Sequence, residues 1–190
     1  MLVPPLDAIR TGAEVIDGAH AKWLAEQAAR RDLIHRLGIP TGPHPLYDEF
    51  ATALAERTGF AYGFVNLFLD QQTFIGLHQP PEGSGYTVIG RTMSIEDGWC
   101  PHVVRRRKAL PLPDVHASHR FSGNTVVDAV GIRAYFGVPL IHPGTGIVLG
   151  TGCVIDPDRR EQSEAGRIQN QVKGTGAEIL VALTAGAPAS

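Results

Sequence analysis

Two stretches near the C-terminal end of the chain decide its fold: residues 131–141 read GIRAYFGVPLI and residues 147–156 read IVLGTGCVID. Both are rich in β-branched and aromatic side chains, which favour strands. Between them, residues 142–146 read HPGTG, and this proline and these glycines are typical of a turn. We therefore predict two long strands, 133–141 and 147–156, which pair in the antiparallel sense because a tight turn joins them.

Shorter strand-like runs precede this pair. Residues 62–69 and 73–77 flank a polar triplet, and aromatic runs around a three-residue polar break predict a hairpin. A short strand is expected at 89–93. Residues 110–115 include two prolines, which cannot donate to a strand ladder, so an edge strand is expected there.

A helix is predicted over residues 45–57. Proline suits its first turn, and Leu46, Phe50 and Leu54 form its expected apolar face. Gly59 is the expected stop. Antiparallel strands covered by helices such as this one predict an α+β domain.

The chain begins with a second helical pattern, over residues 7–37, which Asp7 can cap. Its seam of alternating three- and four-residue steps also passes through His20, Gln27 and Arg30, so it is only half apolar. Two interpretations remain open: the helix packs on its own domain, or it forms a dimer contact.

Two more helices are expected. One starts at Ser94 and carries Trp99, Val103 and Val104, and the last runs over about 162–184. The stretch 116–131 is expected to be irregular or briefly helical. The predicted organisation is a helical extension (1–40), a globular domain (41–184) and a disordered tail (185–190).

The composition excludes several classes of protein. The net charge of the 190 residues is −2, whereas a nucleic-acid binder normally presents a basic surface. The N-terminus lacks the basic and apolar regions of a signal peptide, and no run approaches the roughly 20 apolar residues that cross a bilayer. We expect a cytoplasmic protein that contacts neither nucleic acid nor membrane.

The two cysteines, Cys100 and Cys153, are too few for a disulfide framework. They form either a redox pair or two small buried apolar groups, and a position in the first turns of a helix would lower the pKa of Cys100. Cys100 with His102, His116 and His119 would hold a metal only if their loops converged, and Cys-x-His is not a usual zinc spacing. No metal site is predicted. Asp114 is expected to pair with Arg120 across a bend, and the alternative makes Arg120 a clamp for an anionic ligand.

Several phrases in order resemble the GAF domain family. They are Val65 to Leu69, Gly98 to Val104, Asp114, His119-Arg120-Phe121, Asn124, Gly131 to Leu140 and Leu149 to Asp156. The resemblance spans roughly residues 45–184. It implies a GAF/PAS-like antiparallel sheet of about six strands, flanked by helices, with a pocket on one face roofed by short helices and loops.

The resemblance also implies candidate ligand-binding residues. The pocket walls would be aromatic, from Phe64, Trp99, Phe121 and Tyr135, although the same residues can be plain core. The remaining candidates are Asn66, Cys100, Arg120, Arg133 and Cys153. No catalytic residue is predicted, and the cofactor, if one exists, stays unknown.

Specialised members of the family differ from this chain. The residue set of cyclic-nucleotide-binding members has no counterpart here, and residues 118–133 contain no lysine. Members that reduce free methionine sulfoxide use three cysteines, and this chain has two. In chromophore-attaching members a cysteine shortly precedes a histidine; Cys100 and His102 have that spacing, but the surrounding residues do not match.

We therefore expect a stand-alone sensory module and not a self-sufficient enzyme. It would bind a small molecule or a signalling protein, form a homodimer, and signal through its terminal helices. Two alternatives remain: a thiol-dependent reductase that uses Cys100 and Cys153, and a dimeric scaffold without a pocket.

Overall fold

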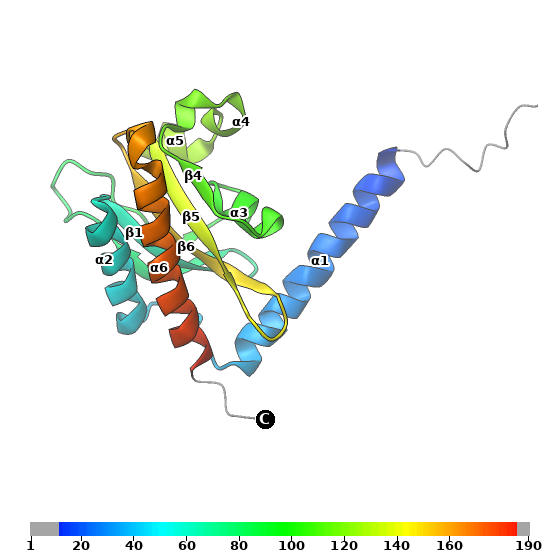
Figure 1. Ribbon diagram of the computed structural model, residues 1–190. Coiled ribbons are helices and arrows are strands. Elements are labelled where there is room, and N and C mark those ends of the chain that lie inside the picture. Colours follow the sequence, from blue (N-terminus) through cyan, green and yellow to red (C-terminus); the bar gives the residue numbers. More distant parts are fainter. Residues whose placement is uncertain (1–11, 186–190) are drawn as a thin grey trace, which may run out of the picture.

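The computed structural model describes residues 12–185 and shows one central antiparallel sheet with helices on both faces (Figure 1). The six strands lie in the order β3-β2-β1-β6-β5-β4. Their bounds are β1 Tyr62–Phe68, β2 Gln72–His78, β3 Thr92–Met93, β4 Leu110–Leu112, β5 Ala134–Ile141 and β6 Val148–Asp156. The predicted α+β fold is confirmed.

The two decisive stretches form β5 and β6. They pair along their whole length, from Ala134 opposite Asp156 to Ile141 opposite Val148. The predicted hairpin is β1 with β2, and β1 pairs with β6 on its other side. β6 therefore lies near the middle of the sheet and is buried throughout. The proline-containing β4 lies at one edge, as predicted.

One face of the sheet is covered by α2 (Pro45–Thr58) and α6 (Ala165–Thr184), the latter preceded by a short 3₁₀ turn, Gln162–Glu164. α2 ends at Gly59 in the left-handed conformation, as expected (φ 72°). Its predicted apolar face is partly wrong, because Leu46 is 42% exposed while Tyr47 and Ala51 are buried.

The buried face of α2 differs from the predicted one because the helix packs very closely against the strands. A Cβ at Gly63 in β1 would lie 2.1 Å from the Ala51 carbonyl oxygen, and one at Gly76 in β2 would lie 2.1 Å from that of Tyr47. The helix rests on backbone at these two points, and this contact turns Leu46 outward. The core on this face contains Leu54 and aliphatic residues of α6.

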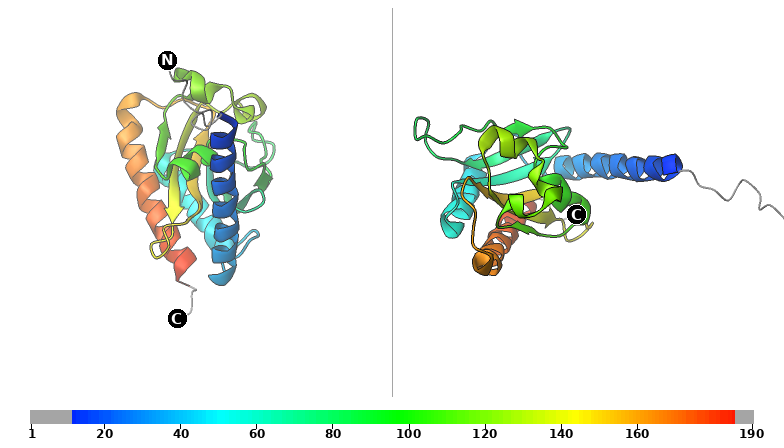
Figure 2. Two further views of the ribbon diagram at one scale, coloured as in Figure 1. Left: turned by 90° about the vertical axis from the view of Figure 1, so that its right-hand side faces the viewer. Right: turned by 90° about the horizontal axis from the view of Figure 1, so that it is seen from above.

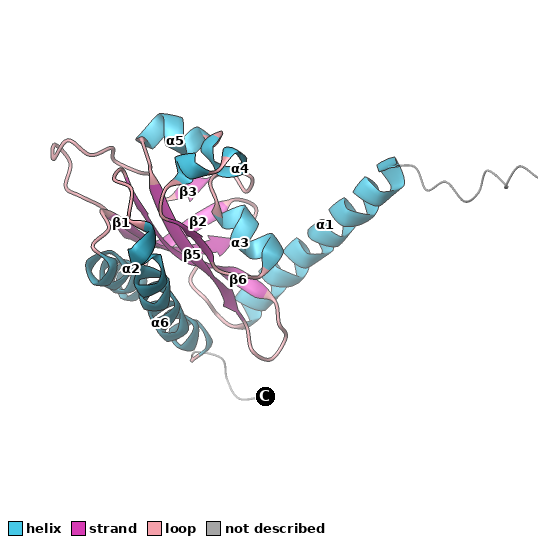
Figure 3. Ribbon diagram, turned by 45° about the horizontal axis from the view of Figure 1, so that its top comes forward, coloured by secondary structure: helices cyan, strands magenta, loops and turns pink. Residues whose placement is uncertain are grey.

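The opposite face is covered by short elements, which Figure 3 shows on the far side of the sheet from α2 and α6. They are α3 (Cys100–Arg106), the 3₁₀ turn Val115–Ala117, α4 (His119–Ser122) and α5 (Thr125–Val130). Beneath them lies a second core, the aromatic core, in which six of the buried residues are aromatic. The sheet thus separates two packed layers of side chains.

The predicted start of α3 at Ser94 is wrong. Ser94 opens a turn, in which the amide of Asp97 donates to the Ser94 carbonyl oxygen (3.2 Å). Gly98 follows with φ 75°, a left-handed conformation that a helix cannot contain. The helix therefore begins only at Cys100.

α1 (Gly12–Arg36) extends from the domain as a long rod (Figure 2). Leu33 and Ile34, near its C-terminal end, are buried in the core under α2 and α6. Trp23 instead packs against the aromatic core on the other face. Asp7 and nearly all of the expected tail lie outside the described residues, and within 12–185 no helix has the length and apolar character required to span a membrane.

Candidate functional site

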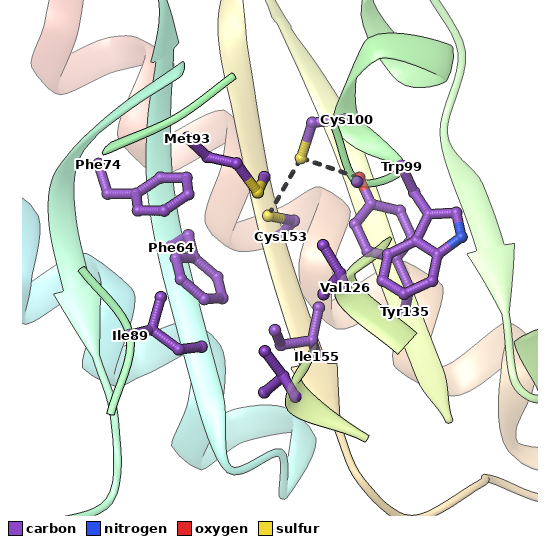
Figure 4. Close-up of a pocket in the computed structure, with 12 residues that line it drawn as sticks. Phe64, Phe74, Ile89, Met93, Trp99, Cys100, Val126, Tyr135, Cys153 and Ile155 are labelled. Atoms are coloured by element: carbon purple, nitrogen blue, oxygen red, sulfur yellow. Dashed lines mark hydrogen bonds between the residues drawn. The ribbon is translucent and has the colours of Figure 1, made fainter. Parts of the chain in front are cut away.

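A pocket lies between the sheet and its roof of short helices (Figure 4). Its volume is about 90 Å³, and no charged side chain lines it. The lining residues are Phe64, Phe74, Ile89, Met93, Gly98, Trp99, Cys100, Val126, Val130, Tyr135, Cys153 and Ile155.

Strand register builds the floor of this pocket. Phe64 of β1 lies directly opposite Cys153 of β6, and Tyr135 of β5 lies opposite Ile155. Since alternate residues of a strand point to the same face, Cys153 and Ile155 share the pocket side of the central strand. Three adjacent strands therefore contribute to one continuous floor.

Gly137 makes room for the tyrosine hydroxyl. It lies opposite Cys153 in the register, and a Cβ at this position would lie 2.0 Å from the Tyr135 hydroxyl oxygen. The phenol ring thus lies over the bare backbone of its own strand, which brings its hydroxyl group to the sulfur of Cys100.

The two thiols meet at one end of the pocket. Cys100 is the first residue of α3, in the roof, and Cys153 lies in the floor, yet their Sγ atoms are only 3.6 Å apart (Figure 4). The Thr151 hydroxyl donates to the Cys100 sulfur (3.2 Å), and the Tyr135 hydroxyl lies 3.3 Å from the same atom. Both cysteines are free and nearly fully buried.

These contacts distinguish the two thiols. Hydrogen bonding from Cys153, joined by Thr151 and Tyr135, lowers the pKa of Cys100 against the effect of burial. The hydrogen bond to Cys100, together with burial, raises the pKa of Cys153 well above its ordinary value. Cys100 is thus the more acidic thiol, because neighbouring donors stabilise its thiolate.

Asn66 lies opposite Thr151 in the strand register, beside this cluster, and does not line the pocket. Its Nδ2 donates to Gln72 Oε1 (2.8 Å), and Gln72 Nε2 donates to the carbonyl oxygens of Ser94 and Asp97 (2.7 Å each). This chain of bonds holds the 94–97 turn over the sheet. The Asn66 amide also contributes to lowering the pKa of Cys100, and its Oδ1 is buried without a hydrogen-bond partner.

Arg120 and Phe121 line a different cavity, of about 230 Å³, together with His102 and Asn124. The Arg120 guanidinium lies 5.4 Å from the centroid of the Phe121 ring. Trp99 borders both cavities and donates from Nε1 to the Phe121 carbonyl oxygen (3.2 Å).

The expected pair of Asp114 with Arg120 is wrong. Asp114 instead accepts from Arg133, whose Nε and Nη2 lie 3.2 and 2.9 Å from the two carboxylate oxygens. The guanidinium lowers the pKa of Asp114. Arg133 is thereby held outside both cavities, so it is not a polar group of either.

The hypothetical four-ligand metal site does not form. Within the described part of the chain, no three histidine, cysteine or acidic residues lie close enough together to hold a metal ion. Cys100 is buried at the pocket, whereas His116 and His119 are exposed.

Of the nine candidate residues, five line the apolar pocket: Phe64, Trp99, Cys100, Tyr135 and Cys153. Sequence reasoning missed Phe74, Ile89, Met93, Gly98, Val126, Val130 and Ile155. Strand alternation from Cys153 could have identified Ile155, and alternation in the hairpin could have identified Phe74. The roof residues Val126 and Val130 lie in a segment without a periodic signal.

Fold and pocket together define a single-sheet α+β domain with an apolar cavity between one sheet face and a roof of short helices. The family model described as "GAF domain" matches residues 42–169, which is most of the chain. The chain belongs to the GAF domain family.

Solved structures support the same fold. Free methionine-R-sulfoxide reductase from Neisseria meningitidis is 14% identical, with a TM-score of 0.54 over 83% of this chain and 87% of that one. The GAF domain of an Acinetobacter phosphoenolpyruvate-protein phosphotransferase is 14% identical, with a TM-score of 0.53 over 86% and 92%. The cyanobacteriochrome receptor PixJ is 16% identical, with a TM-score of 0.51 over 80% and 97%. No curated protein sequence matches the chain.

Proposed function

We propose that this GAF domain is a sensor that binds a small apolar molecule in the pocket under α3 and signals through its terminal helices. The pocket carries the proposal, because its aromatic and aliphatic walls provide no partner for a charged ligand. Its volume of about 90 Å³ is well below the roughly 300–1,000 Å³ of sites for drug-sized ligands. A single ring or a short branched alkyl group is the appropriate size of ligand.

The roof offers a route from the pocket to α1. Trp99 and Cys100 line the pocket at the start of α3, and Arg105 lies in its last turn. The Arg105 guanidinium lies 4.8 Å from the centroid of the Trp23 ring in α1, and the Arg30 guanidinium, also in α1, lies 5.5 Å from the same centroid. A ligand that favours one position of α3 would therefore favour one position of α1.

The output would be a rearranged homodimer. α1 exposes residues 18–22 and 24–25, with Leu24 54% exposed, and α6 exposes Val181 (67%). We propose that both helices meet their copies across a two-fold axis, so that the same surface serves both subunits. Measurement of the mass in solution tests this part: Leu24→Glu should convert a dimer to a monomer, and a monomeric parent protein would refute it.

Native mass spectrometry and the visible absorption spectrum of the purified protein are the first test of the ligand. Toluene is a suitable probe ligand, and its binding can be measured by the fluorescence of Trp99 in a Trp23→Phe background. Val126→Phe, which fills the pocket, should abolish toluene binding, whereas Leu46→Phe on the exposed side of α2 should not. Equal toluene binding by both variants would refute the pocket as the site.

A thiol-dependent reductase is the second candidate, favoured by the 3.6 Å separation of the two Sγ atoms. Turnover with a dithiol reductant that Cys100→Ser abolishes would support it, and retained turnover would exclude it. The pocketless scaffold is the weakest of the alternatives, since a cavity lies beside Trp99 and Tyr135.

A further inference from the structure

The polar atoms near the apolar pocket gather at one place, the sulfur of Cys100. The Thr151 hydroxyl, the Tyr135 hydroxyl and the Cys153 thiol all lie within 3.6 Å of it. We propose that this end of the pocket is a peroxidatic centre that reduces small apolar hydroperoxides, with Cys100 as the attacking thiol and Cys153 as the resolving thiol. The inference rests on the ligand pocket and the reductase candidate above, and it names their substrate class.

The attacking role falls to Cys100 because its thiolate is the one that the neighbours stabilise. Hydroxyl groups that approach a sulfur from two sides favour its ionised form, and the thiolate is the nucleophile in thiol chemistry. Cys153 retains its proton, so it can supply that proton when it attacks in turn. The two thiols therefore differ in the way that a two-step reaction requires.

The substrate class follows from the walls. A molecule in this pocket meets rings and alkyl groups along its length and polar atoms only at the sulfurs. A free amino acid would bring an ammonium and a carboxylate, and burying either without a partner is costly. An alkyl hydroperoxide has an uncharged polar group at one end and an apolar body, which matches this distribution.

The reaction balances without a metal or cofactor. The Cys100 thiolate attacks the terminal oxygen of the hydroperoxide, an S–O bond forms and the O–O bond breaks. The alkoxide takes up the proton that Cys100 released on ionisation and leaves as an alcohol. The Cys153 thiol then attacks the sulfenic sulfur, the S–S bond forms, and hydroxide leaves with the Cys153 proton as water. In sum, two thiols and one hydroperoxide give one disulfide, one alcohol and one water, and an external dithiol restores the thiols.

The geometry suits the second step. The Sγ atoms must approach from 3.6 Å to the roughly 2.05 Å of a disulfide. Cys153 is fixed in the central strand, whereas Cys100 begins a seven-residue helix that follows a turn and Gly98. The helix start can therefore move while the sheet stays in place, and α3 is the element that contacts Trp23.

The test compares tert-butyl hydroperoxide with hydrogen peroxide on the fully reduced protein, followed by stopped-flow fluorescence and intact mass. We expect loss of two hydrogens in the wild-type protein, with a rate constant for the alkyl hydroperoxide at least about tenfold higher, the size of effect that a few apolar contacts give. Cys100→Ser should abolish the reaction. Cys153→Ser should stop at a sulfenic acid, seen as one added oxygen that dimedone traps. Circular dichroism confirms that each variant is folded.

Pocket access provides a matched control. Val126→Phe should strongly slow the reaction with tert-butyl hydroperoxide, and Leu46→Phe should leave the rate of that reaction unchanged. Equal rates for both peroxides, or sulfenic acid formation at Cys153 instead of Cys100, would overturn the inference. Toluene binding is measured on the same samples. If toluene binds and no peroxide reacts, the peroxidatic centre is refuted and the ligand pocket stands; if peroxide reacts and toluene does not bind, the ligand proposal fails instead.

Discussion

Replacing Gly63 with alanine should destabilise the domain more than its single added methyl group suggests. The new Cβ would lie 2.1 Å from the Ala51 carbonyl oxygen and 3.1 Å from the carbonyl carbon, whereas ordinary contacts begin near 3.4 Å. The obstacle is the backbone of α2, so no rotamer change relieves it and the helix must retreat. Overpacking a core usually costs about 1–3 kcal/mol, and we expect the upper end, about 3 kcal/mol. In a domain of this size that corresponds to a melting temperature lower by roughly 6–12 °C.

Urea denaturation followed by circular dichroism measures this loss, and Gly174→Ala is the matched control. Gly174 is exposed in the interior of α6, and a Cβ there has no atom within 4 Å. The same substitution should therefore stabilise the protein by about 0.5–1 kcal/mol, because alanine restricts the unfolded chain and favours the helix. If Gly63→Ala lowers the free energy of unfolding by less than about 0.5 kcal/mol, the inferred close contact between α2 and the sheet backbone is refuted.

Three further predictions concern charge, thiol acidity and α1. The hydrogen bond from Arg133 lowers the pKa of Asp114 below its ordinary value of 3.8. The stabilisation that the ionised carboxylate gives the folded state is therefore complete above pH 3.8 and is lost as the pH falls through the folded-state pKa. Asp114→Asn should remove this part of the acid dependence of the urea midpoint. Tyr135→Phe should raise the pKa of Cys100 and slow its alkylation by iodoacetamide at neutral pH by up to about tenfold, measured by mass spectrometry over a pH series. The buried Arg30 side chain donates to the Val148 carbonyl oxygen. Arg30→Ala should therefore weaken the attachment of α1 by about 1–3 kcal/mol and speed amide hydrogen exchange in residues 30–36. Unchanged exchange would show that the apolar contacts of α1 are sufficient to hold it.

The strands were predictable because their signals are local. β5 and β6 follow from apolar runs around a Pro/Gly turn, and the two prolines near Leu110 place β4 at an edge. The start of α3 was not predictable in the same way. Ser94 has the sequence character of a helix cap, but the buried Gln72 side chain binds the carbonyl oxygens of Ser94 and Asp97 and keeps them in a turn. That bond comes from another strand, which a local pattern cannot reveal.

The site shows the same division between local and distant causes. Phe64, Trp99 and Tyr135 were recognisable as aromatic residues in the right phrases. The meeting of Cys100 with Cys153 depends on a roof helix folding over a central strand 53 residues later in the chain, so sequence spacing could not reveal it. Likewise, the choice of Arg133 over Arg120 as the partner of Asp114 depends on the position of β5 next to β4.

The sheet separates two layers of side chains, and this separation bears on how such a chain can change over generations. Substitutions among the pocket residues alter packing on one side only, while α2 and α6 keep their own apolar contacts with the other side. A change in the pocket lining therefore alters one of the two cores and leaves the other intact. The solved structures that share this architecture are only 14–16% identical to the chain, so the fold tolerates replacement of most of its side chains.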